Sequence, residues 1–479
     1  MRLALPACWL AALTLLAGPA SAQQGAHARP VEVDDWIAKH AAPLRTTEAG
    51  HGFDDLAPIG AMIGDAHVVA LGEATHGTRE FFQLKHRLLE YLVAEKGFTV
   101  FGIEASMPEA FDVNEYVLHG RGDPERALAA LYFRIWNTEE VLDMIRWMRA
   151  WNADPTHRRK VKFYGFDLQY PVRAVKRALD YLRSQDSPAA AVFARELAPI
   201  ESAFELSLHR LAPTSRREAK RVSANRLEAA FDSRRSEWSR RTGVERYAMA
   251  RQYAHLVAQF AQLNALGLHT GFLRDGMMAE NIGWILRHEE PGARMVVWAH
   301  NGHVQAGRFR MGQHLRSAQG KELVICGFAF DRGAFRAVPS SLRTLPAPLG
   351  GGQGLHEFTA PALGGDSLGS ALASAGDPLL ALDLRQVPTS GPVAWLREPR
   401  RAYSIGAVWA PENPDALVVQ DRAPDLYDVL LFVAETHAAR ANPQGRSVDV
   451  LPLLQPADGD FESPAVGSLS AAWYASADA

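Results

Sequence analysis

The chain has 479 residues, of which 47% are hydrophobic and 22% are charged, as in ordinary globular proteins. This length exceeds the size at which one hydrophobic core usually keeps growing, so we expect one large elaborated domain or two. The formal net charge of -3 gives no electrostatic reason to expect a nucleic acid or an anionic membrane as a partner.

The first 22 residues have the pattern of a secretory signal peptide. Arg2 precedes the apolar stretch LALPACWLAALTLLAG, and the small residues PASA end at Ala22. A basic start, a short apolar segment and an Ala-x-Ala site are typical of cleavage on export. We therefore predict a signal peptide at 1–22 and a periplasmic or secreted protein at 23–479. A retained N-terminal anchor is the alternative, although no cysteine stands where a lipoprotein signal needs one.

Cleavage would remove Cys8 and leave Cys326, which excludes an internal disulfide in the mature protein. Cys326 lies in the apolar run ELVICGFAF, so we expect a buried thiol rather than a nucleophile. No stretch after the signal is long and apolar enough to cross a membrane, so we expect no stable membrane insertion.

Short apolar runs recur along the chain and alternate with helical patterns such as TREFFQLKHRLLEYLVAEKG. The runs are HVVAL from residue 67, FTVFGI from 98, VKFYGF from 161, RMVVWA from 294, ELVICGF from 322, PLLALDL from 378 and DVLLFVA from 428. Apolar residues at consecutive positions indicate strands covered on both faces. The alternation predicts an α/β fold, namely a three-layer α/β/α sandwich with a mainly parallel sheet.

Residues 187–290 interrupt this alternation with helical patterns and no clear strand. They include the basic stretch TSRREAKRVSANRLEAAFDSRRSEWSRR, which we interpret as a solvated helix face. We predict a helical insertion at about 187–290 that lies over one edge of the sheet. Residues 339–367 are rich in Gly and Pro and predict a long loop.

Polar side chains follow four of the predicted strands at the point where each strand ends. In chain order they are Glu73 and His76, then Glu104, then Asp167, then His300 and His303. Ligand crevices in open parallel sheets lie outside the carboxyl ends of the strands, where these groups would converge. Gly72 and Gly77 bracket the first ending and are expected to permit a tight turn. Four such endings predict a functional site at this rim, although a single carboxylate after a strand is commonly a helix N-cap.

Three kinds of chemistry fit some of these residues. A histidine beside a carboxylate can act as a general base near neutral pH, which is our preferred prediction for His76 and Glu73. The two histidines of HNGH together with Glu-x-x-His also suit a divalent metal, although HNGH is not the helical HExxH arrangement. GDSLG at 365–369 matches a nucleophilic-serine motif, but no strand precedes it, so Ser367 is better interpreted as a helix N-cap.

At these residues the sequence resembles the erythromycin esterase family. The matching stretches are GEATHGTREFFQLKHRL, FGIEAS, YGFDLQ, RDGMMAENIGWIL, VVWAHNGHV and RMGQHLRSAQG, which run in order between about Leu71 and Thr436. The resemblance implies an α/β/α sandwich with a helical insertion, and hydrolysis of a carboxylic ester or lactone. In the best-known members the substrate is the macrolactone of a macrolide antibiotic, which would make this chain an antibiotic resistance enzyme.

The resemblance also implies roles for individual residues. His76 would be the general base that activates water, Glu73 would orient it, and two histidines would stabilise the oxyanion. The implied catalytic residues are Glu73, His76, Glu104, His300 and His303. The candidates for support or substrate binding are Arg79, Lys85 and Asp167, with a surface position as the other interpretation of Lys85. Direct attack by water needs no cofactor, and the resemblance leaves a divalent metal open.

Two other functions fit the sequence and belong to different classes. One is a metal-dependent hydrolase that uses the same histidines and carboxylates. The other is a non-catalytic periplasmic protein that binds a small ligand in the same cleft. The expected partner is a small molecule in each case, an ester or lactone for a hydrolase. The sequence indicates neither the natural substrate nor the oligomeric state.

Overall fold

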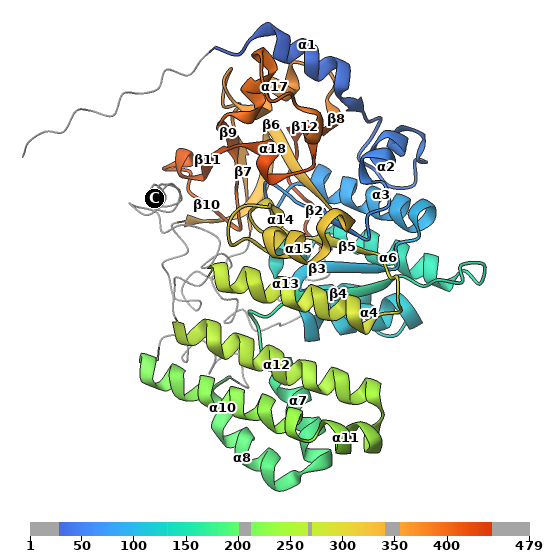
Figure 1. The fold of residues 1–479 in the computed structure, drawn as a ribbon, viewed down its shortest axis with the longest axis vertical. Helices are drawn as coiled ribbons and strands as arrows, with labels where there is room; N and C mark the ends of the chain where they lie inside the picture. The colour runs from blue at the N-terminus through green and yellow to red at the C-terminus, as the bar shows by residue number, and fades with distance from the viewer. Residues whose placement is uncertain (1–27, 132, 201–211, 267–270, 341–354, 443–479) are drawn as a thin grey trace, which may run out of the picture.

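The computed structural model describes residues 28–131, 133–200, 212–266, 271–340 and 355–442, and Figure 1 shows how they are arranged. The predicted signal peptide lies outside these described residues. The predicted α/β/α architecture is confirmed, because helices cover both faces of one large and mainly parallel sheet. Among the described helices, none combines the length and the apolar character needed to span a membrane.

Eight strands form the main path of the sheet. In spatial order they are β1 (Ala42–Pro43), β8 (Leu379–Asp383), β12 (Val429–Thr436), β6 (Leu323–Pro339), β2 (Val68–Leu71), β5 (Met295–Trp298), β3 (Val100–Ser106) and β4 (Lys162–Asp167). The strands from β12 to β4 run parallel, whereas β8 pairs antiparallel with both β12 and β1. Every strand predicted from an apolar run is present, and β8 is the one of them that runs against the others.

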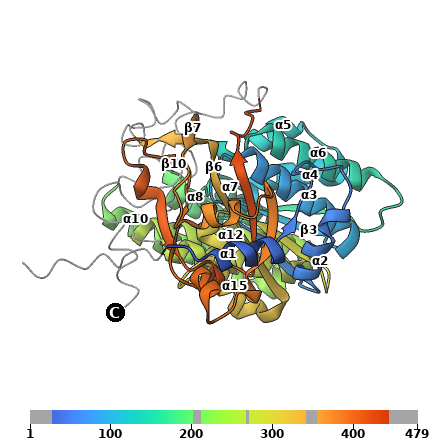
Figure 2. The ribbon, with the colours of Figure 1, turned by 90° about the horizontal axis from the view of Figure 1, so that it is seen from above.

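Strand β2 shows why a continuous apolar run becomes a central strand. Val68 and Ala70 pack into the core on one face, whereas Val69 and Leu71 pack into the core on the other. Successive side chains of a strand point to opposite faces, so a strand buried on both sides needs an apolar residue at every position. Figure 2 shows α3 (Arg79–Lys96), α5 (Pro124–Ala129) and α6 (Glu139–Ala153) on one side of the molecule, and α1 (Val31–His40) and α15 (Met311–Gln319) on the other.

The helices of the first part of the chain are α1 (Val31–His40), α2 (Ala57–Ile63), α3 (Arg79–Lys96), α4 (Met107–His119), α5 (Pro124–Ala129), α6 (Glu139–Ala153) and α7 (Val172–Gln185). Those that follow are α8 (Ser187–Leu197), α10 (Thr214–Ser233), α11 (Arg235–Thr242), α12 (Val244–Leu266), α13 (Gly271–His288), α14 (Asn301–Val304), α15 (Met311–Gln319), α17 (Leu368–Ala373) and α18 (Ala423–Leu426).

Helices α8, α10, α11 and α12 pack on one another and on α7 at one end of the molecule, away from the sheet (Figure 1). Helix α13 contacts β4 and α15, and thereby returns the chain to the sheet. The division of the chain at about 187–290 stays a prediction. The position of α13 matters for the site, because its first turn reaches the rim where the strands end.

The prediction of one long loop at 339–367 is wrong in part. Strand β7 (His356–Ala360) pairs antiparallel with the far end of β6, and residues 341–354 lie outside the described part. Strand β10 (Val408–Trp409) pairs parallel with the same end of β6, while β9 (Arg400–Tyr403) and β11 (Val418–Asp421) form a small sheet of their own. The Gly and Pro residues on both sides of HEFTA hide this five-residue strand from a composition argument.

Candidate active site

The turn after β2 joins a glutamate to a histidine. His76 Nδ1 lies 2.7 Å from Glu73 Oε1, and both side chains are buried. An ionised carboxylate only accepts hydrogen bonds, so Nδ1 carries the proton and donates it, and Nε2 is the basic nitrogen of the neutral ring. The carboxylate therefore fixes the tautomer that a general base requires.

The second carboxylate oxygen of Glu73 is held from two other elements. Lys85 Nζ of α3 donates to Oε2 at 2.6 Å, and Trp298 Nε1 of β5 donates to it at 2.9 Å. Lys85 is fully buried, with Nζ 4.3 Å from the Trp298 ring centre, so it is not a surface lysine. Burial alone would raise the pKa of Glu73, but the Lys85 charge and the His76 hydrogen bond outweigh it and keep that pKa below its ordinary value.

His300 lies beside this pair, at the end of β5. Its ring centre is 4.9 Å from that of His76, and its backbone N–H donates to Glu104 Oε2 at 3.0 Å. His300 Nδ1 accepts the N–H of Gly302 at 3.0 Å, so Nε2 carries the proton and donates to the carbonyl oxygen of Ile405 at 3.2 Å. The HNGH turn thus places the imidazole of His300 beside that of His76.

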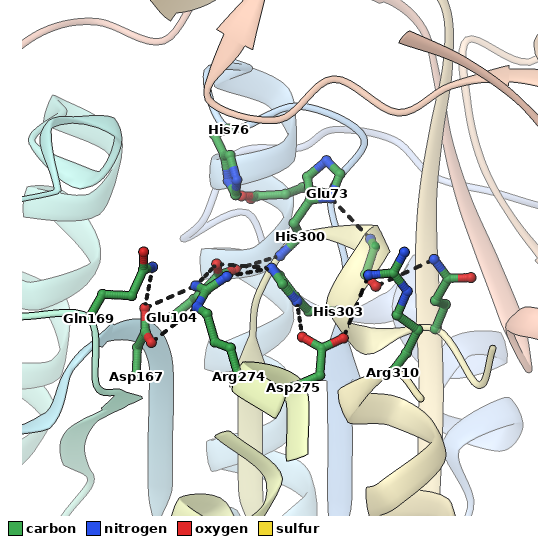
Figure 3. Close-up of polar contacts among 12 residues, drawn as sticks. Glu73, His76, Glu104, Asp167, Gln169, Arg274, Asp275, His300, His303 and Arg310 are labelled. Atoms are coloured by element: carbon green, nitrogen blue, oxygen red, sulfur yellow. Dashed lines mark hydrogen bonds and ion pairs between the residues drawn. The ribbon is translucent and has the colours of Figure 1, made fainter. Parts of the chain in front are cut away.

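A second network, centred on Arg274 of α13, lies below His300 (Figure 3). Arg274 Nη2 donates to Glu104 Oε1 at 2.7 Å and to Asp167 Oδ2 at 2.9 Å. Its Nη1 donates to His303 Nε2 at 3.0 Å, while Nδ1 of that ring lies 2.5 Å from Asp275 Oδ1. Burial raises the pKa of Asp167, but the Arg274 charge and hydrogen bonds lower it more, so this carboxylate stays ionised.

The structure therefore brings together seven of the eight residues singled out in the sequence, including every implied catalytic one. The seven are Glu73, His76, Lys85, Glu104, Asp167, His300 and His303. Arg79 does not join them. Its guanidinium donates to the carbonyl of Ala438 at 3.3 Å and lies 3.8 Å from Glu140. It lines a cavity of about 650 Å³ that contains none of the seven.

A sequence model described as erythromycin esterase matches residues 93–436. The chain belongs to the erythromycin esterase family. The match begins within α3, so the Glu73–His76 turn precedes it, while Glu104, Asp167, His300 and His303 fall inside it.

The chain is also similar to two curated relatives. The chain is 25% identical over 328 residues to erythromycin esterase type II of Escherichia coli, covering 61% of this chain and 76% of that protein. It is 23% identical over 407 residues to the putative hydrolase YbfO of Bacillus subtilis (strain 168), covering 78% and 86%. Family membership and these relatives support a hydrolase.

Solved structures show the same fold. A Bacillus cereus protein superposes with a TM-score of 0.74 at 25% identity, over 86% of this chain and 98% of that one. A mutant of the erythromycin esterase EreC in its open conformation superposes with a TM-score of 0.63 at 17% identity, over 82% and 96%. The second likeness is one of fold alone.

Within this esterase-family chain, sequence reasoning missed Arg274, Asp275 and Trp298 as members of the site. Arg274 and Asp275 are fully or almost fully buried on α13, although they are charged. A signal was present, because Arg274 shares its helical stripe with the apolar residues Met278 and Ile282, which are also buried. A charged residue on an apolar stripe predicts a buried partner, which here is the pair of carboxylates on β3 and β4.

The two glycines of the first turn are required for a reason other than the expected tight turn. Neither Gly72 nor Gly77 has a positive φ, so a tight left-handed turn is not the reason for them. A Cβ on Gly72 would meet Asn301 Oδ1 at 2.1 Å, and one on Gly77 would meet the backbone oxygen of Arg336 at 2.1 Å. Both positions need glycine for close packing.

Two expectations about other polar side chains are confirmed. Ser367 is the N-cap of α17, where its Oγ accepts the N–H of Ser370 at 3.1 Å and donates to the carbonyl of Gly364. The Cys326 thiol is fully buried, and burial raises its pKa. Neither residue is placed as a nucleophile.

The donor set of the site does not resemble a metal centre. Among the described residues, no group of three His, Cys, Asp or Glu side chains is arranged to hold a metal ion. The carboxylates of Glu73, Glu104 and Asp167 instead accept hydrogen bonds from Lys85 and Arg274. Two protein cations are thus the charged partners of these carboxylates.

Proposed function

We propose that this chain is an exported hydrolase of carboxylic esters or lactones, in which His76 activates a water molecule. The observation that carries the proposal is the chain of contacts from Lys85 through Glu73 to His76. It orients the imidazole so that Nδ1 faces the carboxylate and Nε2 points away from it, beside a second imidazole at a strand end. This is the arrangement that general-base catalysis requires.

The proposed reaction starts when His76 Nε2 takes a proton from water as the water oxygen bonds to the carbonyl carbon. The carbonyl electrons move onto its oxygen, and the Glu73 carboxylate stabilises the imidazolium that forms. Collapse of the tetrahedral intermediate breaks the bond to the alkoxy group, which takes the proton back from His76. The products are an acid and an alcohol, joined in one molecule when the substrate is a lactone.

The two remaining histidines receive different roles in this proposal. His300 is next to His76, and its Nε2–H donates to a backbone carbonyl at 3.2 Å, a bond that an oxyanion can replace. His303 is held on Nδ1 by Asp275 and on Nε2 by Arg274. We therefore assign His303 to positioning Arg274 and Glu104 rather than to direct contact with the oxyanion.

Macrolide macrolactones are one substrate class that family membership suggests, and the relative from Escherichia coli is named an erythromycin esterase. An exported enzyme would act on such a drug before it reaches the cytoplasm. The basis for export is the pattern of residues 1–22, which the structure does not describe. The mass of the intact protein from the periplasmic fraction is expected to correspond to cleavage after Ala22.

The test is to incubate the purified protein with a panel of macrolides, lactones and simple esters, and to detect the gain of one water by mass spectrometry. We expect turnover of at least one compound, and a loss of about 100-fold or more in kcat for His76→Ala. His437→Ala is the matched control. His437 Nδ1 also lies 2.8 Å from a glutamate, Glu80, but on an exposed part of the surface.

Other outcomes would identify the rival functions. Near-normal turnover by a folded His76→Ala protein would contradict the general-base role. Loss of activity on chelation, with recovery on addition of zinc or manganese, would indicate the metal-dependent hydrolase. A ligand that co-purifies with a protein inert toward the whole panel would indicate the non-catalytic binding protein.

A further inference from the structure

Phe309 is the one non-glycine residue with a positive φ among the described residues, at 64°. It is the third residue of the turn Gly307–Arg310, which is closed by a hydrogen bond from Arg310 N–H to the carbonyl of Gly307 at 3.0 Å. This turn position favours glycine when φ is positive, and a bulky side chain there is strained. Strain of this kind persists where the surrounding structure holds it, and it often marks a functional site.

The surrounding structure does hold Phe309 in this conformation. Its backbone N–H donates to Gln313 Oε1 at 2.6 Å, from the first turn of α15. The Arg308 guanidinium lies 4.5 Å from the centre of the Phe309 ring. The strain is not compensated by burial, because 45% of Phe309 remains exposed.

A second exposed aromatic residue faces Phe309. Phe272, in the first turn of α13, is 39% exposed, and the two ring centres lie 5.5 Å apart at an interplanar angle of 60°. Single exposed apolar residues are common on protein surfaces and need no explanation. Two phenylalanines that present their rings together, one of them in a strained conformation, form a small apolar platform.

This platform is linked to the candidate active site through Asp275. Phe272 precedes Asp275 by three positions, which makes the two residues neighbours on α13. Arg310, adjacent to Phe309, has Nη1 3.8 Å from Asp275 Oδ2, and Asp275 in turn contacts His303 (Figure 3). Helix α13, which carries Phe272, thus also positions His303, and the turn that carries Phe309 contacts this helix through Arg310.

From these contacts we infer that Phe272 and Phe309 form an apolar subsite for the hydrocarbon part of the ester or lactone substrate. The inference rests on the proposed function and adds to it two residues that favour esters with a long aliphatic skeleton. A ring pair can contact one face of such a skeleton while the polar ester group reaches His76. Aromatic side chains suit this role because they offer a large rigid apolar area.

The experiment compares p-nitrophenyl acetate, butyrate and octanoate as substrates. For the wild-type protein we expect kcat/KM to rise with acyl length, by at most about fourfold for each methylene group that is buried. Phe309→Ala and Phe272→Ala are each expected to lower kcat/KM for the octanoate about tenfold and to leave the acetate unchanged. Val244→Ala removes an exposed apolar side chain from the distant insertion and serves as the control.

A further variant separates a substrate contact from a structural role. Phe309→Gly relieves the left-handed strain, so it is expected to raise the melting temperature while it loses the octanoate preference to the same extent. A lower melting temperature would show that the protein itself uses the ring for packing, and the inference would be overturned. Unchanged kcat/KM for the octanoate in both alanine variants would overturn it as well.

A binding measurement distinguishes failure of this inference from failure of the proposed function. The probe is octyl p-nitrophenyl ether, which keeps the apolar chain and has no carboxylic ester, titrated by calorimetry. If the wild type hydrolyses none of the esters but binds the ether about tenfold more tightly than Phe309→Ala, the subsite stands and the hydrolase proposal fails. Equal affinities in the two proteins would overturn the subsite.

Discussion

Among single residues, Lys85 keeps the Glu73 carboxylate charged. It is the cation that contacts Glu73, and no part of either side chain is exposed. Without that ammonium a buried carboxylate favours its protonated form, which no longer orients His76 as a charged acceptor. We therefore expect Lys85→Met to lower kcat about 100-fold on a responsive ester, measured alongside circular dichroism to establish folding.

A matched lysine exists elsewhere in the chain. Lys162 Nζ also contacts a glutamate, Glu289, at 2.8 Å, but outside the site and with the lysine partly exposed. Lys162→Met is expected to keep kcat within about twofold of the wild type, because exposed ion pairs contribute little. Equal losses in the two variants would mean that Lys85 acts through general stability and not through Glu73.

The pKa of Lys85 leads to a prediction of how activity depends on pH. Burial lowers the pKa of Lys85 to about 8, although the Glu73 charge partly opposes this shift. The ammonium is therefore present below about pH 8 and is lost above it, so kcat/KM should fall on the alkaline side. Lys85→Arg, whose guanidinium stays charged, should extend activity to higher pH if the protein folds. A wild-type profile that remains flat up to pH 10 would contradict this role.

Among the elements, the β2–α3 turn is held in place by backbone from two other segments. The carbonyl of Gly77 accepts the N–H groups of Arg336 and Ala439, at 3.1 and 2.9 Å. A Cβ at Gly77 would lie 2.1 Å from the backbone oxygen of Arg336, which a rotamer change cannot relieve. Gly77→Ala should therefore displace the turn and His76, and lower kcat about 100-fold in a protein that still folds.

The control for this prediction is Gly365→Ala. Gly365 has no atom within 4 Å of a Cβ built on it, and its φ is not positive. Its substitution should leave kcat unchanged, and steady-state kinetics of both variants provide the comparison. Full activity of Gly77→Ala would show that the turn tolerates the displacement.

The sequence predicts those strands whose signal lies in their own residues. Strands β2 to β5 and the first half of β6 each contain a run of consecutive apolar residues, and that signal lies within the strand itself. The polar endings of four strands could be assigned to one site because parallel strands end at the same rim. Strand β7 has only five residues and lies between Gly and Pro residues. It forms through its pairing with β6, which its own sequence does not reveal.

The missed part of the site depends on long-range packing. Arg274 and Asp275 come more than one hundred residues after Asp167, beyond the helices from α7 to α12. No local pattern says that α13 crosses the ends of β3 and β4. The Phe272–Phe309 pair is missed for the same reason, since one ring belongs to helix α13 and the other to the turn before α15. The close approach at Gly77 likewise depends on a segment of β6 that is distant in sequence.

For the whole molecule, a buried ion pair helps to attach the N-terminal segment to α3. Asp55 accepts hydrogen bonds from Arg87 Nη1 and Nη2 at 3.0 and 2.5 Å, and Arg87 is fully buried. Asp55→Ala would leave this guanidinium buried without its carboxylate, so we expect the free energy of unfolding in urea to fall by about 3 kcal/mol. Asp54→Ala, which removes an almost fully exposed neighbour, should change it by less than about 0.5 kcal/mol.

The same pair contributes to acid unfolding of the whole chain. Burial alone would raise the pKa of Asp55, but the Arg87 hydrogen bonds and charge outweigh it and hold that pKa well below its usual range. The unfolded chain therefore binds a proton near pH 4 that the folded chain does not, and the stabilisation present above pH 4 is lost as pH falls. Urea titrations from pH 7 to pH 3 should show a shallower decline for Asp55→Ala than for the wild type. Parallel declines in the two proteins would assign the acid sensitivity to other carboxylates, of which Glu73 and Asp167 have pKa values lowered in the same direction.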